Sequence, residues 1–230
     1  MYFQHSSEIW SEFPELAAGV LFVDGISKDV SVADHLTPFQ RTAEARLAVS
    51  SEGEFPEIQA WRRAFSTMGL KPTQYRCAAE ALLRRFRKEG SLPELHPLID
   101  LCNAMSLAYA IPVAVFDASR ISDGLEVRHA VGDESYLTFS GQTETPEVGE
   151  VVFADGVGNA HARRWTNRQS AYSAARDTTS TVLIVAEALH DSAPADVRDL
   201  TSTIADELNT IWTVKSHQAQ LSRSAPRFEF

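Results

Sequence analysis

The chain has 230 residues, 44% of them hydrophobic and 23% charged, which is ordinary for a globular protein with one large or two small domains. Its 31 acidic against 21 basic side chains give a net charge of −10, which argues against indiscriminate binding of polyanions such as DNA. No apolar run approaches the roughly 18 residues of a membrane span and residues 1–20 lack a secretory core, so we expect a cytoplasmic protein that does not enter membranes.

Before residue 120 the patterns are mostly helical. Apolar side chains recur every three or four residues in four segments, which is the spacing of amphipathic helices. The predicted helices cover residues 34–47, 57–68, 72–89 and 98–109. Two short apolar runs, 19–25 and 111–116, instead have the length and the bounding residues of strands.

After residue 125 the hydrophobic period changes to two, which predicts strands. These strands cover residues 125–128, 136–139, 148–154, 159–165 and 181–186. A turn around Gly132 should join the first two, and Asp155-Gly156-Val157-Gly158 should close the next two into a hairpin. Pro194 begins a final amphipathic helix, and the residues after His217 form a polar tail. Helices first and strands later predict an α+β fold with a mixed, largely antiparallel sheet flanked by helices.

One segment concentrates positive charge in this acidic protein. Residues 163–169 read Arg-Arg-Trp-Thr-Asn-Arg-Gln, which places three guanidiniums and an indole in seven positions. Arginine suits bidentate contacts with phosphate or carboxylate, and tryptophan offers a flat face for a base. The alternatives are ion pairs with Glu150, Asp155 or Asp177 and ordinary core packing of Trp165. Strand alternation would place Arg163 and Trp165 on one face and Arg164 on the other.

A second basic stretch lies between residues 60 and 90, where eight Lys or Arg side chains face only two Glu. The basic residues are Arg62, Arg63, Lys71, Arg76, Arg84, Arg85, Arg87 and Lys88. They are either solvated helix faces or, together with the 163–169 cluster, a surface that meets an anionic partner.

Three stretches, 75–85, 92–117 and 149–170, together resemble the B3/B4 domain. This module occurs in the beta subunit of phenylalanyl-tRNA synthetase and in freestanding bacterial proteins, and the resemblance is closest to the freestanding branch. It implies a B3/B4-like domain over residues 56–192. We expect residues 1–55 to add a strand and a helix, and residues 193–230 a helix and the tail, in one compact unit.

In the synthetase the B3/B4 domain hydrolyses tyrosine that is wrongly esterified to the phenylalanine tRNA. The resemblance therefore implies a protein related to aminoacyl-tRNA, which acts in trans as an editing deacylase if it is an enzyme. Two positions depart from the synthetase pattern: Ala114 replaces a histidine, and Arg168 replaces the glutamate that recognises the tyrosine hydroxyl. A guanidinium only donates hydrogen bonds, so tyrosine editing by the same contacts is not expected here.

We expect one pocket to collect the ligand-binding residues, namely Asn103, Arg163, Arg164, Trp165, Arg168 and Gln169. The arginines would hold terminal phosphates or a developing oxyanion, and Trp165 would stack on the terminal adenine. Asn103 and Gln169 would fix a water or an amino group. The tRNA backbone would meet Arg76, Arg84 and Arg85. No side chain is assigned as catalytic, and no metal site or cofactor is expected.

Two other classes of function also fit these residues. The first is a non-catalytic module that binds an amino acid or a small carboxylate through its arginines. The second is a protein-docking domain whose basic face meets an acidic partner. Ionic strength separates the first of these from a tRNA-binding protein, since contacts with tRNA phosphates weaken steeply as salt is added.

Overall fold

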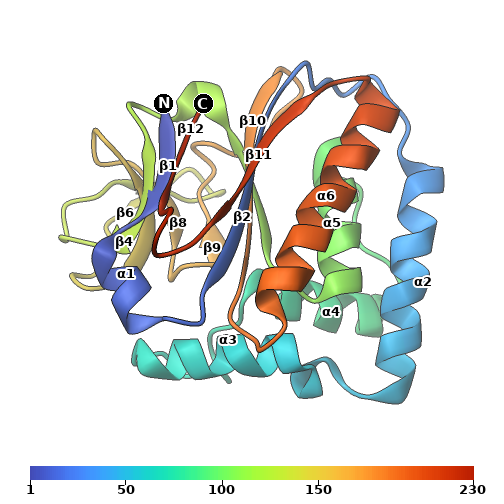
Figure 1. Ribbon diagram of the computed structural model, residues 1–230, viewed down its shortest axis with the longest axis horizontal. Coiled ribbons are helices and arrows are strands. Elements are labelled where there is room, and N and C mark those ends of the chain that lie inside the picture. The colour runs from blue at the N-terminus through green and yellow to red at the C-terminus, as the bar shows by residue number, and fades with distance from the viewer.

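The computed structural model describes residues 1–230 and stacks two β-sheets and a layer of helices, as Figure 1 shows. The strands are β1 (Tyr2–His5), β2 (Ala17–Asp24), β3 (Val113–Asp117), β4 (Leu125–His129), β5 (Tyr136–Leu137), β6 (Thr143–Glu144), β7 (Val151–Asp155), β8 (Ala160–Arg163), β9 (Arg168–Gln169), β10 (Thr181–Ala188), β11 (Ser216–Leu221) and β12 (Arg227–Glu229). The helices are α1 (Ser7–Glu12), α2 (Ala33–Val49), α3 (Pro56–Thr67), α4 (Ala78–Glu89), α5 (Pro97–Tyr109) and α6 (Ala193–Trp212). None of these helices combines the length and the apolar character that a membrane crossing requires.

The strands form a six-stranded sheet in the order β12-β1-β4-β7-β8-β9 and a four-stranded sheet in the order β11-β2-β10-β3. β5 and β6 form a separate two-stranded sheet. Every pair is antiparallel except β1 with β4, so the predicted α+β class with a largely antiparallel sheet is confirmed.

The four-stranded sheet is buried on both faces. In Figure 1 the six-stranded sheet lies on one side of it, and α5 and α6, with α2 outside them, lie on the other. Along β10, Leu183 and Val185 enter the core between the sheets, whereas Val182 and Ile184 enter the core beneath the helices. A strand with apolar side chains on both faces is typical of a central layer. This packing fixes the side on which each β10 residue lies.

The predicted helices at 34–47, 57–68, 98–109 and from Pro194 are confirmed, but the predicted helix over 72–89 begins only at Ala78. The N–H groups of Gln74 and Tyr75 both donate to the Lys71 carbonyl, which makes a turn instead. The Ala78 N–H donates to the Thr166 carbonyl at 2.8 Å, and the Cys77 sulfur accepts from the Glu80 N–H at 3.5 Å. The start of α4 is therefore set by a contact with a distant loop.

The predicted hairpin of β7 and β8 is confirmed, whereas two other expectations for the second half are wrong. Residues 125–128 and 136–139 do not pair with each other, because β4 pairs with β7 and β1 while β5 pairs only with β6. The strand predicted to run to Trp165 ends at Arg163. Its last residues turn away from the sheet.

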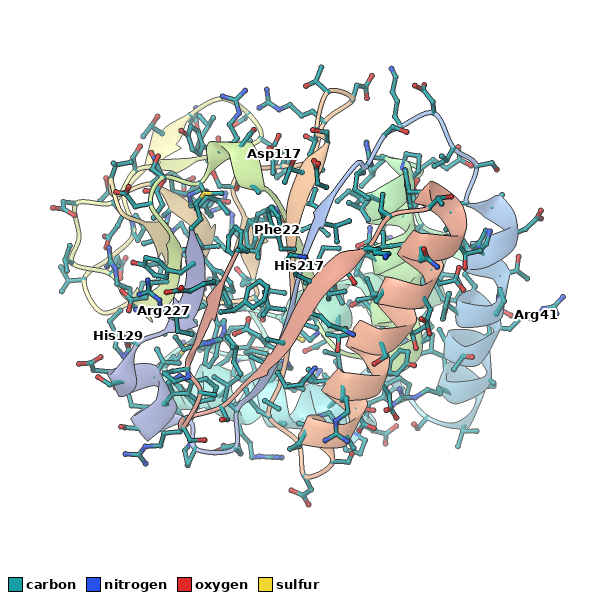
Figure 2. The ribbon with its side chains drawn as sticks, turned by 45° about the horizontal axis from the view of Figure 1, so that its top comes forward. Phe22, Arg41, Asp117, His129, His217 and Arg227 are labelled. Atoms are coloured by element: carbon teal, nitrogen blue, oxygen red, sulfur yellow. The ribbon has the colours of Figure 1, made fainter.

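The prediction of a polar tail after His217 is wrong as well. β11 pairs with β2, and Figure 2 shows His217 beside Phe22, its register partner. β12 pairs with β1, so the two chain ends lie side by side in Figure 1. β11 and β12 are edge strands, and each has one face in water. Their hydrophobic pattern is therefore weak, which is why the sequence was interpreted as a polar tail.

We expect Leu183→Ala to lower the free energy of unfolding by about 2–5 kcal/mol, because Leu183 is fully buried between the sheets and its loss leaves a cavity. Urea unfolding followed by circular dichroism measures this change. Val49→Ala is the control, since Val49 is 88% exposed and should change stability by less than about 0.5 kcal/mol. Equal effects of the two substitutions would contradict the two-core architecture.

Candidate functional site

A cavity of about 70 Å³ opens beside the start of β3, between the first residue of α4 and the segment that follows β8. Its apolar lining consists of Ala78, Pro112, Val113, Ala114, Phe153, Ala162, Trp165 and Val185. Its polar lining consists of Thr166, Asn167, Arg168, Gln169 and Glu187. Apolar walls with a few polar groups are typical of a site for a small ligand or for one end of a larger one.

Two left-handed residues shape the segment that closes this cavity. Arg164 and Trp165 have φ angles of 47° and 56°, a region that non-glycine residues enter at a cost of about 1–2 kcal/mol each. The Trp165 N–H donates to the Val151 carbonyl at 2.7 Å, which holds the turn against β7. The turn sends the Trp165 ring into the core and the Arg164 guanidinium over the Tyr75 ring at 4.8 Å. The expected strand alternation of Arg163, Arg164 and Trp165 is therefore wrong.

Trp165 is wholly buried and lines the cavity from within the core. Its ring meets those of Phe13 and Trp61 edge-on, at 4.9 and 5.0 Å between centroids. The indole Nε1 donates to Glu187 Oε1 at 2.9 Å. With no exposed ring face, the indole has no room to stack on an adenine. In this site it positions a carboxylate instead.

Glu187 is the cavity residue that the sequence reasoning missed. Its side chain is 98% buried, and Oε1 lies 2.6 Å from Nε2 of His5 in addition to its bond from Trp165. Oε2 accepts no hydrogen bond within the protein, yet it is not fully enclosed. It is therefore the oxygen that faces the cavity. The signal in the sequence is a single acidic residue near the end of the apolar run 181–188, where the predicted strand stopped two residues too early and so left Glu187 out.

Arg163 forms ion pairs within the protein, which was the alternative to ligand binding for the 163–169 cluster. Its Nε and Nη2 each donate to a Glu150 oxygen at 2.8 Å, and its Nη1 donates to Glu144 Oε2 at 2.6 Å. Burial alone would raise the pKa of Glu150, but the hydrogen bonds and the charge of Arg163 outweigh it and hold the pKa below the ordinary value. Arg163 does not line the cavity; it ties β8 to the loop before β7 and to the β5–β6 hairpin.

Arg168 and Gln169 lie at the mouth of the cavity. The Arg168 guanidinium is about two-fifths exposed, lies 5.3 Å from the centroid of the Tyr136 ring and donates one bond to Glu144 at 3.2 Å. Gln169 Nε2 donates to the Val115 carbonyl at 2.5 Å, which leaves its Oε1 free. Of the six residues predicted to share one pocket, the structure brings together Trp165, Arg168 and Gln169. Asn103 on α5, Arg163 and Arg164 do not line it.

The basic stretch of α3 and α4 is partly neutralised. Arg76 lies 3.4 Å from Glu80, which also pairs with Arg62, and Arg85 pairs with Glu89 at 2.8 Å. Arg84 is exposed and forms no ion pair. Arg63, Lys71 and Lys88 are likewise exposed and form no ion pair. Unpaired cations therefore lie on α3, on the turn that follows it and on α4, whose first residue, Ala78, lines the cavity.

Other reactive side chains are enclosed. Burial raises the pKa of the Cys77 and Cys102 thiols to about 12, so neither forms a thiolate at neutral pH. His161 lies 2.8 Å from Ser173 Oγ and 3.3 Å from Asp155, but both the serine and the histidine are fully buried. His, Cys, Asp and Glu form no group of three that could hold a metal ion. The cavity thus contains no serine, cysteine or histidine nucleophile.

The family model of the B3/4 domain matches residues 60–202, well over half of the chain. The chain belongs to the B3/4 domain family. The matched span includes every residue that lines the cavity, whereas His5 lies outside it. The resemblance recognised in the sequence is confirmed, and with it a B3/4 module related to a tRNA synthetase.

Curated relatives of this B3/4 protein include the beta subunits of phenylalanine–tRNA ligase. That of Photorhabdus laumondii is 23% identical over 141 residues, which are 60% of this chain and 18% of the subunit. That of Rhodopseudomonas palustris is 28% identical over 143 residues, 59% of this chain and 17% of the subunit. That of Coxiella burnetii is 38% identical over 63 residues, 27% of this chain and 8% of the subunit. The chain thus spans less than a fifth of the length of these relatives.

Among solved structures, an N-terminal fragment of the phenylalanyl-tRNA synthetase beta subunit from Pyrococcus horikoshii matches with a TM-score of 0.49 and 9% identity. The match covers 95% of this chain and 53% of that one.

We expect Arg163→Met to destabilise the protein by about 3–5 kcal/mol, because it leaves the buried Glu150 carboxylate, whose side chain is only 8% exposed, without its partner. A folded-state pKa below the ordinary 4.5 adds stability above that pH, and this contribution is lost as the pH falls through the folded-state value. Arg163→Met should therefore flatten the loss of stability that the wild type shows below about pH 4.5. Urea unfolding as a function of pH measures both effects.

The matched control is Arg168→Ala, which removes the exposed partner of Glu144 and should cost less than about 1 kcal/mol. A wild-type acid transition that Arg163→Met leaves unchanged would contradict the assigned role of this ion pair.

Proposed function

We propose that this protein binds the aminoacylated 3′ end of a tRNA in the cavity and hydrolyses the aminoacyl ester. The observation that carries the proposal is a small, mainly apolar cavity with a buried carboxylate, Glu187, inside it and an arginine, Arg168, at its mouth. Phosphates at the mouth and an amine inside would match these charges. The relatives named as tRNA ligase subunits support tRNA as the carrier of the aminoacyl group.

The charge of Glu187 argues against a free amino acid or another small carboxylate as the ligand. A free carboxylate in the cavity would lie near a second negative charge in a site with little water, which is costly. In an aminoacyl ester that carboxylate is esterified and neutral, and the amino group remains. Glu187 therefore favours the ester over the small-carboxylate alternative.

Hydrolysis of this ester requires few groups from the protein. Water adds to the carbonyl carbon, the acyl–oxygen bond breaks, and the products are the free amino acid and the tRNA hydroxyl. Arg168 and the positive end of the α4 dipole, which begins at Ala78 in the cavity wall, supply positive potential near the carbonyl oxygen as it gains charge. Gln169 Oε1 has no hydrogen-bond partner in the protein and is available to hold the water.

We expect the wild-type protein to release the amino acid from at least one mischarged tRNA in a panel of aminoacyl-tRNAs. Arg168→Ala should lower kcat/KM by roughly 10- to 100-fold, the range for losing one charged contact to the reacting group. The measurement is the decay of labelled aminoacyl-tRNA under single-turnover conditions.

Arg41→Ala provides the matched control, because Arg41 projects from the outer side of α2, away from both sheets, as Figure 2 shows. It should leave the rate unchanged. Absence of hydrolysis by the wild type on every tRNA in the panel, with no binding at low salt, would refute the proposed function.

We expect the affinity for tRNA to fall steeply between about 50 and 200 mM salt, because each phosphate contact releases counterions. Arg84→Ala should weaken binding to all tRNAs and reduce the slope of log K against log salt by about 1, as for one lost contact. Fluorescence anisotropy with labelled tRNA measures the slope, and Arg41→Ala should leave it unchanged. Binding that does not depend on salt would indicate that this surface does not meet the tRNA backbone.

A further inference from the structure

Resting on the proposed function, the geometry points to a specific role for Glu187: we infer that its Oε2 binds a positively charged nitrogen of the aminoacyl group. The side chain is 98% buried and belongs to the lining of the cavity. Oε1 already accepts from Trp165 and pairs with His5, whereas Oε2 has no partner within the protein. A carboxylate oxygen that faces a small cavity requires a donor, and a cationic nitrogen is the strongest one available to it.

The state of His5 decides how much negative charge remains at the site. His5 is buried, its Nε2 faces Glu187 Oε1 at 2.6 Å, and its Nδ1 is sealed without any hydrogen-bond partner. Protonation would place an unsatisfied N–H at Nδ1 in the core, which is unfavourable. A proton on Nε2 alone would let His5 donate to Glu187 Oε1 without an unpaired N–H at Nδ1, and such a neutral ring would bring no counter-charge to the carboxylate.

No other cation neutralises Glu187. Arg168 is the only basic side chain in the lining, and its guanidinium lies over Tyr136 and donates to Glu144. A buried charge without a full counter-charge is unfavourable until a ligand supplies one. The binding energy of a cationic group is therefore largest at this oxygen.

The carboxylate is also held rigidly before any ligand arrives. Trp165 is fixed edge-on between Phe13 and Trp61, and the His5 ring lies against Phe3 and Trp10 at 5.2 and 5.0 Å. Both donors of Oε1 thus come from packed aromatic clusters. Preorganisation of this kind lowers the entropy lost on binding.

An aminoacyl group offers a cationic nitrogen from two sources, its α-amino group or a basic side chain. Amino-acid amides separate them, because they resist hydrolysis, lack a free carboxylate and need no tRNA. Amides of neutral amino acids test the α-amino group, N-acetylated amides of lysine and arginine test the side chain, and N-acetylated neutral amides contain no cation.

Isothermal titration of the wild type should show binding of one of the two cationic groups of compounds, either the amides of neutral amino acids or the N-acetylated amides of lysine and arginine. The N-acetylated neutral amides should not bind. Glu187→Gln should weaken that binding by roughly 10- to 100-fold, as expected for a hydrogen bond to a charged group. Glutamine keeps an oxygen that can accept from Trp165 and His5, so the fold should persist, and thermal unfolding checks this. Glu94→Gln, an exposed carboxylate on the loop before α5, should leave binding unchanged.

Should Glu187→Gln not fold, the carboxyl ¹³C shift of Glu187 in the wild type tests the same contact, and it should move on adding the bound amide. Equal binding of cationic and neutral amides, or an unchanged affinity in folded Glu187→Gln, would overturn the inference even if tRNA deacylation is intact. Deacylation that is absent while Glu187-dependent binding of amides persists would refute the proposed function alone.

Discussion

The hydrogen bonds to the Glu187 carboxylate connect the parts of the molecule that form the cavity. Glu187 lies on β10 in the four-stranded sheet, whereas His5 and Trp165 come from β1 and from the turn after β8 in the six-stranded sheet. A buried carboxylate must have its hydrogen bonds satisfied, so this residue fixes how the two sheets lie against each other. It does so with one oxygen only, and the second oxygen remains for the cavity.

The arginine cluster is divided between structure and surface. Glu144 accepts from both Arg163 and Arg168, but only Arg163 also pairs with Glu150 and is buried. The left-handed turn at Arg164 separates the two roles, because it ends β8 and redirects the chain across the cavity mouth. An acidic protein can therefore carry three close guanidiniums without presenting all of them to a ligand.

Local patterns predicted the elements that bury one regular face. The helical stripes and the Asp155–Gly158 turn encode their own structure, and the confirmed helices and the β7–β8 hairpin follow from them. The sequence could not predict β1 or β11, whose pairing depends on partners far along the chain. Nor could it place Glu187 beside His5, 182 positions away, or reveal the left-handed turn that buries Trp165. Such features arise from tertiary contacts rather than from periodicity.

The charge inside the cavity affects how readily the product of the proposed reaction leaves. The ester substrate brings a neutral carbonyl near Glu187, but hydrolysis turns it into a carboxylate in the same place. Two negative charges roughly 6 Å apart repel by about 3 kcal/mol at an effective dielectric constant of about 20. That repulsion acts on the product and not on the substrate, so it favours release of the amino acid. In the proposed reaction the same repulsion would also weaken the binding of free amino acids.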